Sequence, residues 1–169
     1  MRSPIEHNSI IVLMTVPSEL SPRSIYSTRQ VREFDRTAIE KFGIDSFELM
    51  RRAAAASLQY LQRRWPNAKS LIVYCGAGNN AGDGYVLASF AADAGLKVRI
   101  VAMVDPSELR GDAAKAYGLA VERNLIVELN AVGPCPTAAI DLAVDALLGT
   151  GLSRDVDGAY AAVIDAINS

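Results

Sequence analysis

The chain has 169 residues, and 50% of them are hydrophobic, which is enough for one packed domain of ordinary size. Its 17 Lys and Arg residues nearly balance 19 Asp and Glu residues, for a formal net charge of −2. No basic stripe stands out, so the charge pattern argues against a nucleic-acid-binding role. No apolar run approaches the length of a membrane-spanning helix, which argues against a membrane protein.

The cysteine pattern indicates a reducing compartment. Cys75 and Cys135 lack the spacing of a metal site, and the chain shows no clear export signal, so we expect reduced thiols and a cytoplasmic protein. Cys75 lies beside the glycine-rich turn described below, where a thiol nucleophile would need a neighbouring base. The only histidine, His7, lies in the N-terminal tail, so we interpret both cysteines as structural.

Residues 1–26 are expected to form a flexible tail ahead of one domain at 27–169. The tail contains three prolines and scattered charge. Its apolar run at 10–16 imitates the core of a signal peptide, but no small-residue cleavage pattern follows cleanly. Met14 is a second candidate start of translation, in which case the residues before it are an artefact.

Two amphipathic helices are expected at the start of the domain. The first begins at a capping box formed by Ser27 and Gln30 and stops at Gly43, with apolar residues at helical spacing between them. The second begins near Ser46 and ends before Trp65, again with apolar residues on one face. These are the two leading helices of the predicted fold.

The rest of the chain alternates short apolar runs, typical of buried strands, with helical segments. The expected strands are 71–74, 97–104, 124–129 and 140–147, and the expected helices are 85–94 and 107–121, the latter capped by Ser107. This order predicts a three-layer, Rossmann-like α/β fold with a mostly parallel sheet and right-handed crossovers.

A glycine-rich turn, GAGNNAGDG at 76–84, follows the first expected strand. Gly76 and Gly78 permit backbone angles that a Cβ forbids, so the chain can reverse tightly and expose N–H groups to a ligand. With Ala81 they satisfy a loose dinucleotide-binding pattern. The acidic residue that this pattern requires about 20 positions further on is not convincingly placed, so a Rossmann dehydrogenase is disfavoured.

The polar residues of this turn are Asn79, Asn80 and Asp83, at the point where a helix is expected to begin. A helix start carries unpaired N–H groups and a partial positive charge, which favour a bound phosphate. The alternative is a turn that connects strand and helix without any ligand.

A second polar segment, VDALLGTGLSRDVDG, occupies residues 144–158. Asp145 interrupts an apolar strand near its carboxyl end, the edge of an open α/β sheet where ligands bind. If the two strands are neighbours, the Asp145 carboxylate and the amide oxygens of the turn at 79–80 would together surround a cation.

The same segment contains a glycine turn at 149–151 that can approach a phosphate. Arg154 either supplies a positive charge to that phosphate or is a solvated loop residue paired with Asp155 or Asp157. The residues themselves leave both roles open.

The joint occurrence of GAGNNAGDG at 76–84 and VDALLGTGL at 144–152 closely resembles the YjeF N-terminal domain family, the NAD(P)H-hydrate epimerases. The segment 26–54 is similar to the two leading helices of that family, and the resemblance extends over 26–169. It implies an isomerase of nicotinamide nucleotide repair that interconverts the R and S forms of hydrated NADH and NADPH (NAD(P)HX). It also implies a partner dehydratase, which in many bacteria is a second domain of the same polypeptide, and a homodimer formed through the leading helices.

The resemblance further implies the residues of the site. A potassium ion would be held by Asn80 and Asp145. The implied substrate-binding residues come from both polar segments and are Asn79, Asn80, Ala81, Gly82, Asp83, Gly149, Thr150, Gly151, Leu152, Ser153, Arg154 and Asp155.

Inversion of the hydrated ring carbon needs a proton shuttle, whether water leaves and returns or the ring opens and closes. Asp83 is the candidate catalytic residue, although it serves equally well as a cap for its helix. A monovalent cation would organise the loop and polarise bound oxygen, because it is a weak Lewis acid compared with zinc.

Three departures from the family pattern are evident. Ala81 replaces a usual Gly, and Arg51 and Ala54 replace Glu and Gly in the second helix. The chain also stops at Ser169, before a DIPSG-like motif whose Asp and Ser complete the family's site. We therefore expect a domain truncated at its C-terminal end, either a fragment or a short copy that binds weakly.

Two other functions compete with the epimerase. A noncatalytic ligand-binding or scaffolding module is one alternative, since relatives of this domain occur in proteins such as RNA-decapping enhancers. An NAD-dependent oxidoreductase is the other, but no catalytic His or Tyr–Lys pair lies in a recognisable place. The combination of Asn80, Asp83 and Asp145 favours the epimerase.

Overall fold

The computed structural model describes residues 26–130, 140–152 and 155–168. Its elements in chain order are α1 (Thr28–Glu40), α2 (Ser46–Arg64), β1 (Ser70–Cys75), α3 (Asn79–Asp93), β2 (Lys97–Ala102), the 3₁₀-helix η1 (Pro106–Glu108), α4 (Gly111–Glu122), β3 (Val127–Leu129), β4 (Leu142–Ala146) and α5 (Gly158–Ile167). Within the described ranges, the strands form one parallel sheet in the order β3-β2-β1-β4.

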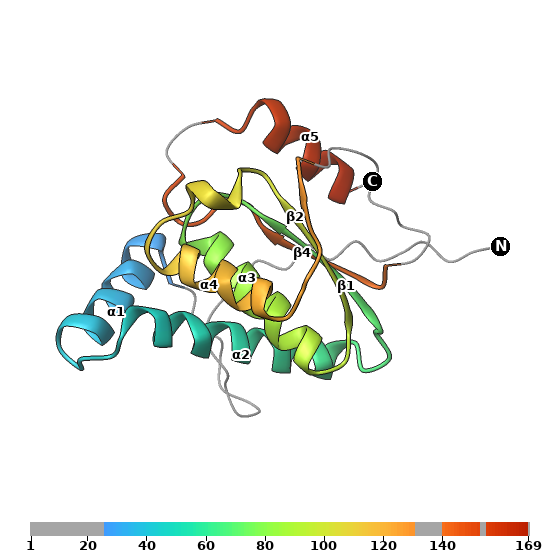
Figure 1. Cartoon of the computed structure of the whole chain (residues 1–169). Helices are drawn as coiled ribbons and strands as arrows, with labels where there is room; N and C mark the ends of the chain where they lie inside the picture. Colours follow the sequence, from blue (N-terminus) through green and yellow to red (C-terminus); the bar gives the residue numbers. More distant parts are fainter. Residues whose placement is uncertain (1–25, 131–139, 153–154, 169) are drawn as a thin grey trace.

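The helices lie on both faces of this sheet (Figure 1). α2, α3 and α4 contribute to an apolar cluster on one face, and α5 contributes to a second cluster on the other. α1, drawn in blue, lies at one side of the molecule next to the start of α2. The predicted three-layer α/β fold with two leading helices is confirmed. No helix in the described ranges is long and apolar enough to cross a membrane.

β1 is central, and all six of its residues are buried. At its carboxyl end Cys75 pairs with Ala102 of β2 on one side and with Ala146 of β4 on the other. Its side chains alternate between the two clusters, so Val73 packs with α3 and Tyr74 packs with α5. Parallel pairing therefore places the loops that follow β1, β2 and β4 at one edge of the sheet.

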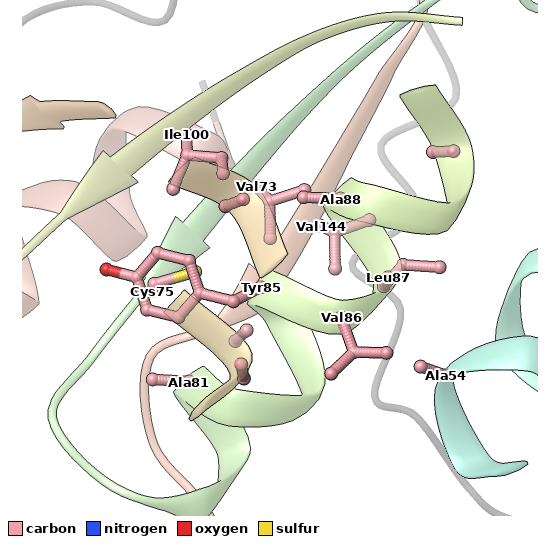
Figure 2. Close-up of a cluster of buried hydrophobic side chains, with 14 of the residues drawn as sticks. Ala54, Val73, Cys75, Ala81, Tyr85, Val86, Leu87, Ala88, Ile100 and Val144 are labelled. Carbon is pink, nitrogen blue, oxygen red and sulfur yellow. The ribbon is translucent and has the colours of Figure 1, made fainter. Parts of the chain in front are cut away.

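α3 lies directly on the sheet. Figure 2 shows Ala81, Tyr85 and Ala88 of this helix beside Val73 and Ile100 of the strands. Each of these five side chains is fully buried. The helix is apolar almost all round because the sheet, α2 and α4 enclose it.

Two glycines let α3 approach its neighbours closely. A Cβ on Gly84 would lie 2.6 Å from the Cβ of Ala146, and a Cβ on Gly82 would lie 2.6 Å from Cε of Met50. Real Cβ atoms do not approach other atoms so closely. Packing against β4 therefore excludes a side chain at Gly84, whereas a Cβ at Gly82 would require the flexible end of the Met50 side chain to move.

α1 begins as the sequence predicts. The Ser27 hydroxyl accepts from the Gln30 N–H, and the Gln30 side chain accepts from the Ser27 N–H at 2.9 Å, which completes a capping box. The helix buries none of its side chains fully, and Phe34 in its middle turn is 51% exposed. Its amphipathic pattern is therefore not explained by the core of this chain.

The helix expected at 85–94 is longer than predicted, because α3 begins at Asn79. Apolar periodicity predicts its start at residue 85, but residues 79–84, which carry only small or polar side chains, already have helical geometry. Short polar side chains are tolerated there because they belong to the first turns, where backbone groups still lack partners.

The prediction of one helix over 107–121, capped by Ser107, is wrong. Asp105 caps a short 3₁₀-helix by accepting from the Ser107 N–H at 2.9 Å. The chain then extends, and α4 begins at Gly111, whose φ of +58° suits a residue without a Cβ.

The strands are shorter than predicted. β2 ends at Ala102 rather than at residue 104, and β4 covers Leu142–Ala146 rather than 140–147. β3 begins at Val127 instead of 124 because Asn124, with φ +53°, belongs to the turn that ends α4. The predicted tail lies outside the described residues up to residue 25, as does Cys135.

Candidate functional site

The first glycine of the turn after β1, Gly76, lies in close contact with the backbone of the loop after β4. A Cβ on Gly76 would lie 1.9 Å from the carbonyl oxygen of Leu147, and the Gly76 N–H donates to the Ala146 carbonyl at 3.1 Å. Neither Gly76 nor Gly78 has a positive φ, so the prediction that both were needed for unusual backbone angles is wrong. Gly76 is required because β1 and the loop after β4 run in contact.

Gly78 is the N-cap of α3 and forms no side-chain capping bond, as expected for a residue without a side chain. No atom lies within 4 Å of the place where its Cβ would stand. The first N–H groups of α3 lack partners within the helix and receive no side-chain cap from Gly78, and a helix N-terminus of this kind suits an anionic group.

Asn80 joins the two polar segments of the sequence. Its Nδ2 donates to the carbonyl of Leu148 at 3.0 Å, and a Cβ on Gly149 would lie 3.3 Å from the Asn80 Cβ. The start of α3 and the loop after β4 are thus in direct contact, although 68 residues separate the two hydrogen-bonded residues in the chain.

Asp145 lies one residue before the end of β4, paired in register with Tyr74 of β1. Its Oδ1 accepts from the N–H of Leu147 at 2.9 Å. The carboxylate therefore closes the turn that leads into the loop held by Asn80. Asp145 and Asn80 stand at the same edge of the sheet, beside successive residues, Leu147 and Leu148.

A pocket of about 300 Å³ opens at this edge, a size at the lower end of small-molecule sites. It is lined by the turn after β1, the loop after β4 and the start of α5, namely by Ala77, Gly78, Leu147, Leu148, Gly149, Gly151, Leu152, Asp155, Val156, Asp157 and Tyr160. Asn80 and Asp145 do not line it themselves. They adjoin it through their hydrogen-bond partners Leu148 and Leu147.

Asp83 lies on α3 one turn after Asn80, half-buried, on the side of the helix that faces Asp35 of α1. Burial raises the pKa of its carboxyl to about 7, with a further contribution from the negative charge of Asp35 on α1. Burial also raises the pKa of Asp35. Because α3 begins at Asn79 and is capped by Gly78, Asp83 lies beyond the first turn, and the alternative that it caps its helix is wrong.

Sequence reasoning missed Arg32 of α1. Its Nε donates to the Thr150 hydroxyl at 3.4 Å and its Nη2 donates to the Thr150 carbonyl. The contact spans 118 residues, and a single arginine on an exposed helix has no pattern that distinguishes it from a solvated one. No signal in this sequence alone would have revealed it.

The other predicted binding residues differ in how accessible they are to a ligand. Asn79 is exposed at the helix start, whereas Ala81 is fully buried and lies in a helix with negative φ, as the replacement of Gly by Ala requires. Gly82 donates its N–H to the Gly78 carbonyl and packs on α2, so packing accounts for it. Ser153 and Arg154 lie outside the described residues.

Cys75 is fully buried at the end of β1, and burial raises the pKa of its thiol. A protonated thiol without access to solvent is not a nucleophile. Its structural interpretation agrees with this placement, in the apolar layer under α3.

Groups of three His, Cys, Asp or Glu residues suited to a metal ion do not occur in the part of the chain that the structure describes. The oxygen donors beside Asn80 are its own side-chain amide, the carboxylate of Asp145 and nearby main-chain carbonyls, while the carboxylates of Asp155 and Asp157 line the pocket itself. Oxygen donors without His or Cys fit an alkali or alkaline-earth cation better than zinc or another transition metal.

Comparison with known proteins decides the family. Residues 46–169 match the family described as YjeF-related protein N-terminus. The chain belongs to this family. The matched range contains both polar segments and the strands that carry them, so the resemblance inferred from the sequence is confirmed.

Relatives of this YjeF N-terminal domain are named as NAD(P)H-hydrate repair enzymes and NAD(P)H-hydrate epimerases. The bifunctional NAD(P)H-hydrate repair enzyme Nnr of Coxiella burnetii is 42% identical over 147 residues, which cover 85% of this chain and 29% of the relative. The NAD(P)H-hydrate epimerase of Rhodopirellula baltica is 34% identical over 164 residues, which cover 96% of this chain and 66% of the relative. The chain thus spans less than a third of the first relative and about two thirds of the second.

A solved structure shows the same fold as this YjeF N-terminal domain. The crystal structure of the yeast protein YNL200c superposes with a TM-score of 0.72 at 18% sequence identity, covering 86% of this chain and 65% of the yeast chain. The family match begins at Ser46, so α1 and its Arg32 lie outside the matched range although they contact the loop after β4.

Proposed function

We propose that this domain is an NAD(P)H-hydrate epimerase, which interconverts the R and S forms of hydrated NADH and NADPH. The observation that carries the proposal is the hydrogen bond from Asn80 to Leu148, because it joins the two family motifs beside one pocket. The names of the relatives support the same activity.

The start of α3 supplies a site for the nucleotide's phosphate. The N–H groups of Asn79 and Asn80 have no partner within the helix, and Gly78 leaves room for close approach. Leu147, Leu148 and Leu152 give the pocket an apolar side, which suits a ring more than a phosphate. The nucleotide would thus bind with its phosphate at the helix start and its apolar parts against the loop.

A potassium ion would be held by the Asp145 carboxylate and the Asn80 amide oxygen. When bound, it would neutralise charge and keep the loop after β4 in place. Asp145 already orders this loop through the Leu147 N–H, and Asn80 does so through the Leu148 carbonyl. Through these bonds both residues would couple a bound cation to the shape of the pocket.

Asp83 is the proposed proton carrier. A pKa of about 7 means that both its acid and its carboxylate forms are present at neutral pH, the condition for efficient general acid–base catalysis. The acid form would protonate the leaving hydroxyl of the hydrated ring, releasing water and leaving a cationic ring and a carboxylate. Water added to the opposite ring face would return its proton to that carboxylate. Asp83 does not line the pocket, so this role requires the nicotinamide ring to extend from the pocket into the space between α3 and α1.

The S form would pass to a dehydratase, which the bifunctional relatives suggest as a partner activity.

We also propose a homodimer in which α1 takes part. Phe34 in this helix is 51% exposed, and Phe42 just after it is 75% exposed. Sedimentation velocity would test this, with Phe42→Ser expected to weaken the dimer. A monomer at all concentrations would contradict it.

The buried free thiol of Cys75 is compatible with a cytoplasmic location.

The activity can be tested with a coupled assay. The protein would be mixed with R-NADPHX and a dehydratase that accepts only the S form, with potassium in one arm and sodium in the other. We expect NADPH to be recovered faster than spontaneous epimerisation allows. A folded protein with no rate above background would contradict the proposal and favour a noncatalytic binding module.

The cation site has its own test in the same assay. Asp145→Asn keeps an oxygen that can accept from the Leu147 N–H but removes the charge. We expect this variant to lose its response to potassium. An unchanged potassium response would remove Asp145 from the cation site while leaving the epimerase assignment intact.

A further inference from the structure

The loop after β4 is anchored from two different helices. Asn80 of α3 holds the Leu148 carbonyl, and Arg32 of α1 holds Thr150 by both its carbonyl and its hydroxyl. Within the loop, the Leu152 N–H donates to the Gly149 carbonyl at 3.3 Å, which makes a turn with Thr150 at its corner. The two anchors therefore lie on either side of Gly149.

The position of Thr150 determines the wall of the pocket. Gly149 and Gly151 on its two sides line the pocket, as do Leu148 and Leu152. Glycine gives this backbone many accessible conformations, so the loop needs an external anchor to hold one shape. The guanidinium provides it, because two of its donors reach two oxygens of the same residue and so restrict both position and orientation.

The contact is poorly explained as a contribution to folding. Arg32 is exposed, and α1 buries none of its side chains fully. Arg36, one turn further along the same helix, pairs instead with Glu33 on the helix surface at 2.7 Å. The two arginines therefore differ in that only Arg32 reaches across to the pocket loop.

We propose that Arg32 is a positioning residue, which fixes the loop around Thr150 in the shape that binds the nucleotide. α1 is then a part of the site, although it lies outside the matched family range. The role of Arg32 in turnover rests on the proposed epimerase function, whereas its hold on the loop does not.

Kinetics of three variants test the role in binding. Arg32→Ala removes the anchor, Arg32→Lys keeps the charge without the planar two-donor group, and Arg36→Ala is the matched control on the same helix. Loss of a contact that supports bound substrate and transition state equally raises KM and leaves kcat unchanged. We expect Arg32→Ala to raise KM for R-NADPHX about tenfold, Arg32→Lys to lie between it and the parent, and Arg36→Ala to match the parent. An unchanged KM in Arg32→Ala, or the same change in Arg36→Ala, would overturn the proposal.

Hydrogen exchange of the free protein tests the anchor without substrate or turnover. In Arg32→Ala we expect amides in the segment 149–152 to exchange about tenfold faster, while amides of α3 exchange as in the parent. Unchanged exchange in this loop would overturn the proposal even if the protein is an active epimerase. Faster exchange in a protein without epimerase activity would retain the anchor and reject only the proposed function.

Discussion

α3 and α1 hold the same loop, yet they are built in opposite ways. α3 holds it through Asn80 and buries nine of its fifteen residues, whereas α1 holds it through Arg32 and buries none. In α3 the residues of the site and of the core alternate within the same turns, so a substitution there affects folding and function together. In α1 the two can be separated, which makes it the better place to alter the site alone.

The largest expected effect falls on the α3 side of this comparison. Asp83→Asn removes the proposed proton carrier with almost no change in volume, and we expect kcat to fall by about 10²- to 10⁴-fold. The coupled assay measures this, and the kcat–pH profile of the parent should show a titration near pH 7 that the variant lacks. If the variant retains parental kcat, the proton is carried by another group.

The next largest effect is on stability at the turn before α3. Gly76→Ala would place a Cβ 1.9 Å from the Leu147 carbonyl oxygen, and only a backbone shift can relieve this, so we expect a loss of at least about 3 kcal/mol in the free energy of unfolding. Gly78→Ala is the matched control, since its Cβ meets nothing within 4 Å and should change stability by less than about 1 kcal/mol. Urea denaturation of both variants decides, and equal stabilities would contradict the close packing of β1 on the loop.

The buried acid of α3 also predicts how stability depends on pH. The folded-state pKa of Asp83, about 7, lies above its unfolded value of about 3.9. Its contribution to stability is therefore fully present below about pH 4 and is lost as the pH rises through about 7. We expect Asp83 to cost the folded state about 2 kcal/mol between pH 5 and pH 8, a smaller figure than the pKa difference alone implies because its carboxylate keeps some solvent contact.

Denaturation of the parent and of Asp83→Asn at pH 5 and pH 8 measures this dependence. The variant should lose less stability than the parent over that interval. Carboxylates whose pKa is lowered, such as Asp141 with its bonds from Lys69 and Ser70, act below this interval. A parallel response of parent and variant would show that Asp83 is ionised in the folded protein at both pH values.

The smallest effect belongs to α1. Ser27→Ala removes one half of its capping box, at a cost of about 1 kcal/mol to the helix. Because α1 is not fixed by buried side chains, we expect its amides to exchange about fivefold faster, while those of α3 are unchanged. Faster exchange in α3 as well would show that the two helices open together and are not independent.

Much of this architecture was predictable because it depends on local patterns. The Ser27 capping box, the short apolar strands and the polar run at 79–83 all carry their signal within a few residues, and the alternation of strand and helix then predicts a parallel sheet. The predicted start of α3, residue 85, is too late because the residues before it are small or polar. Hydrophobic periodicity gives no signal for a helix in such a segment. The segment 107–121 was misjudged because Asp105 and Pro106 favour a 3₁₀ turn over continued helix.

The glycines show where sequence reasoning reaches its limit. The sequence predicts that Gly76 permits a tight turn through unusual backbone angles, whereas the structure requires Gly76 for packing against Leu147, as it requires Gly84 for packing against Ala146. A glycine needed for close approach and a glycine needed for positive φ look the same in a sequence. Only the neighbouring chain distinguishes them.

The sequence by itself determined the fold class, the two polar segments and the family to which the chain belongs, because each depends on the order of residue types along the chain. Tertiary structure alone decided that Asn80 meets Leu148, that Asp83 lies beside Asp35, and that Arg32 holds Thr150. Those contacts join residues far apart in the sequence, and the packing of helices on a parallel sheet determines which of them become neighbours. Burial and the charge of Asp35, which no local pattern records, then raise the pKa of Asp83 to about 7.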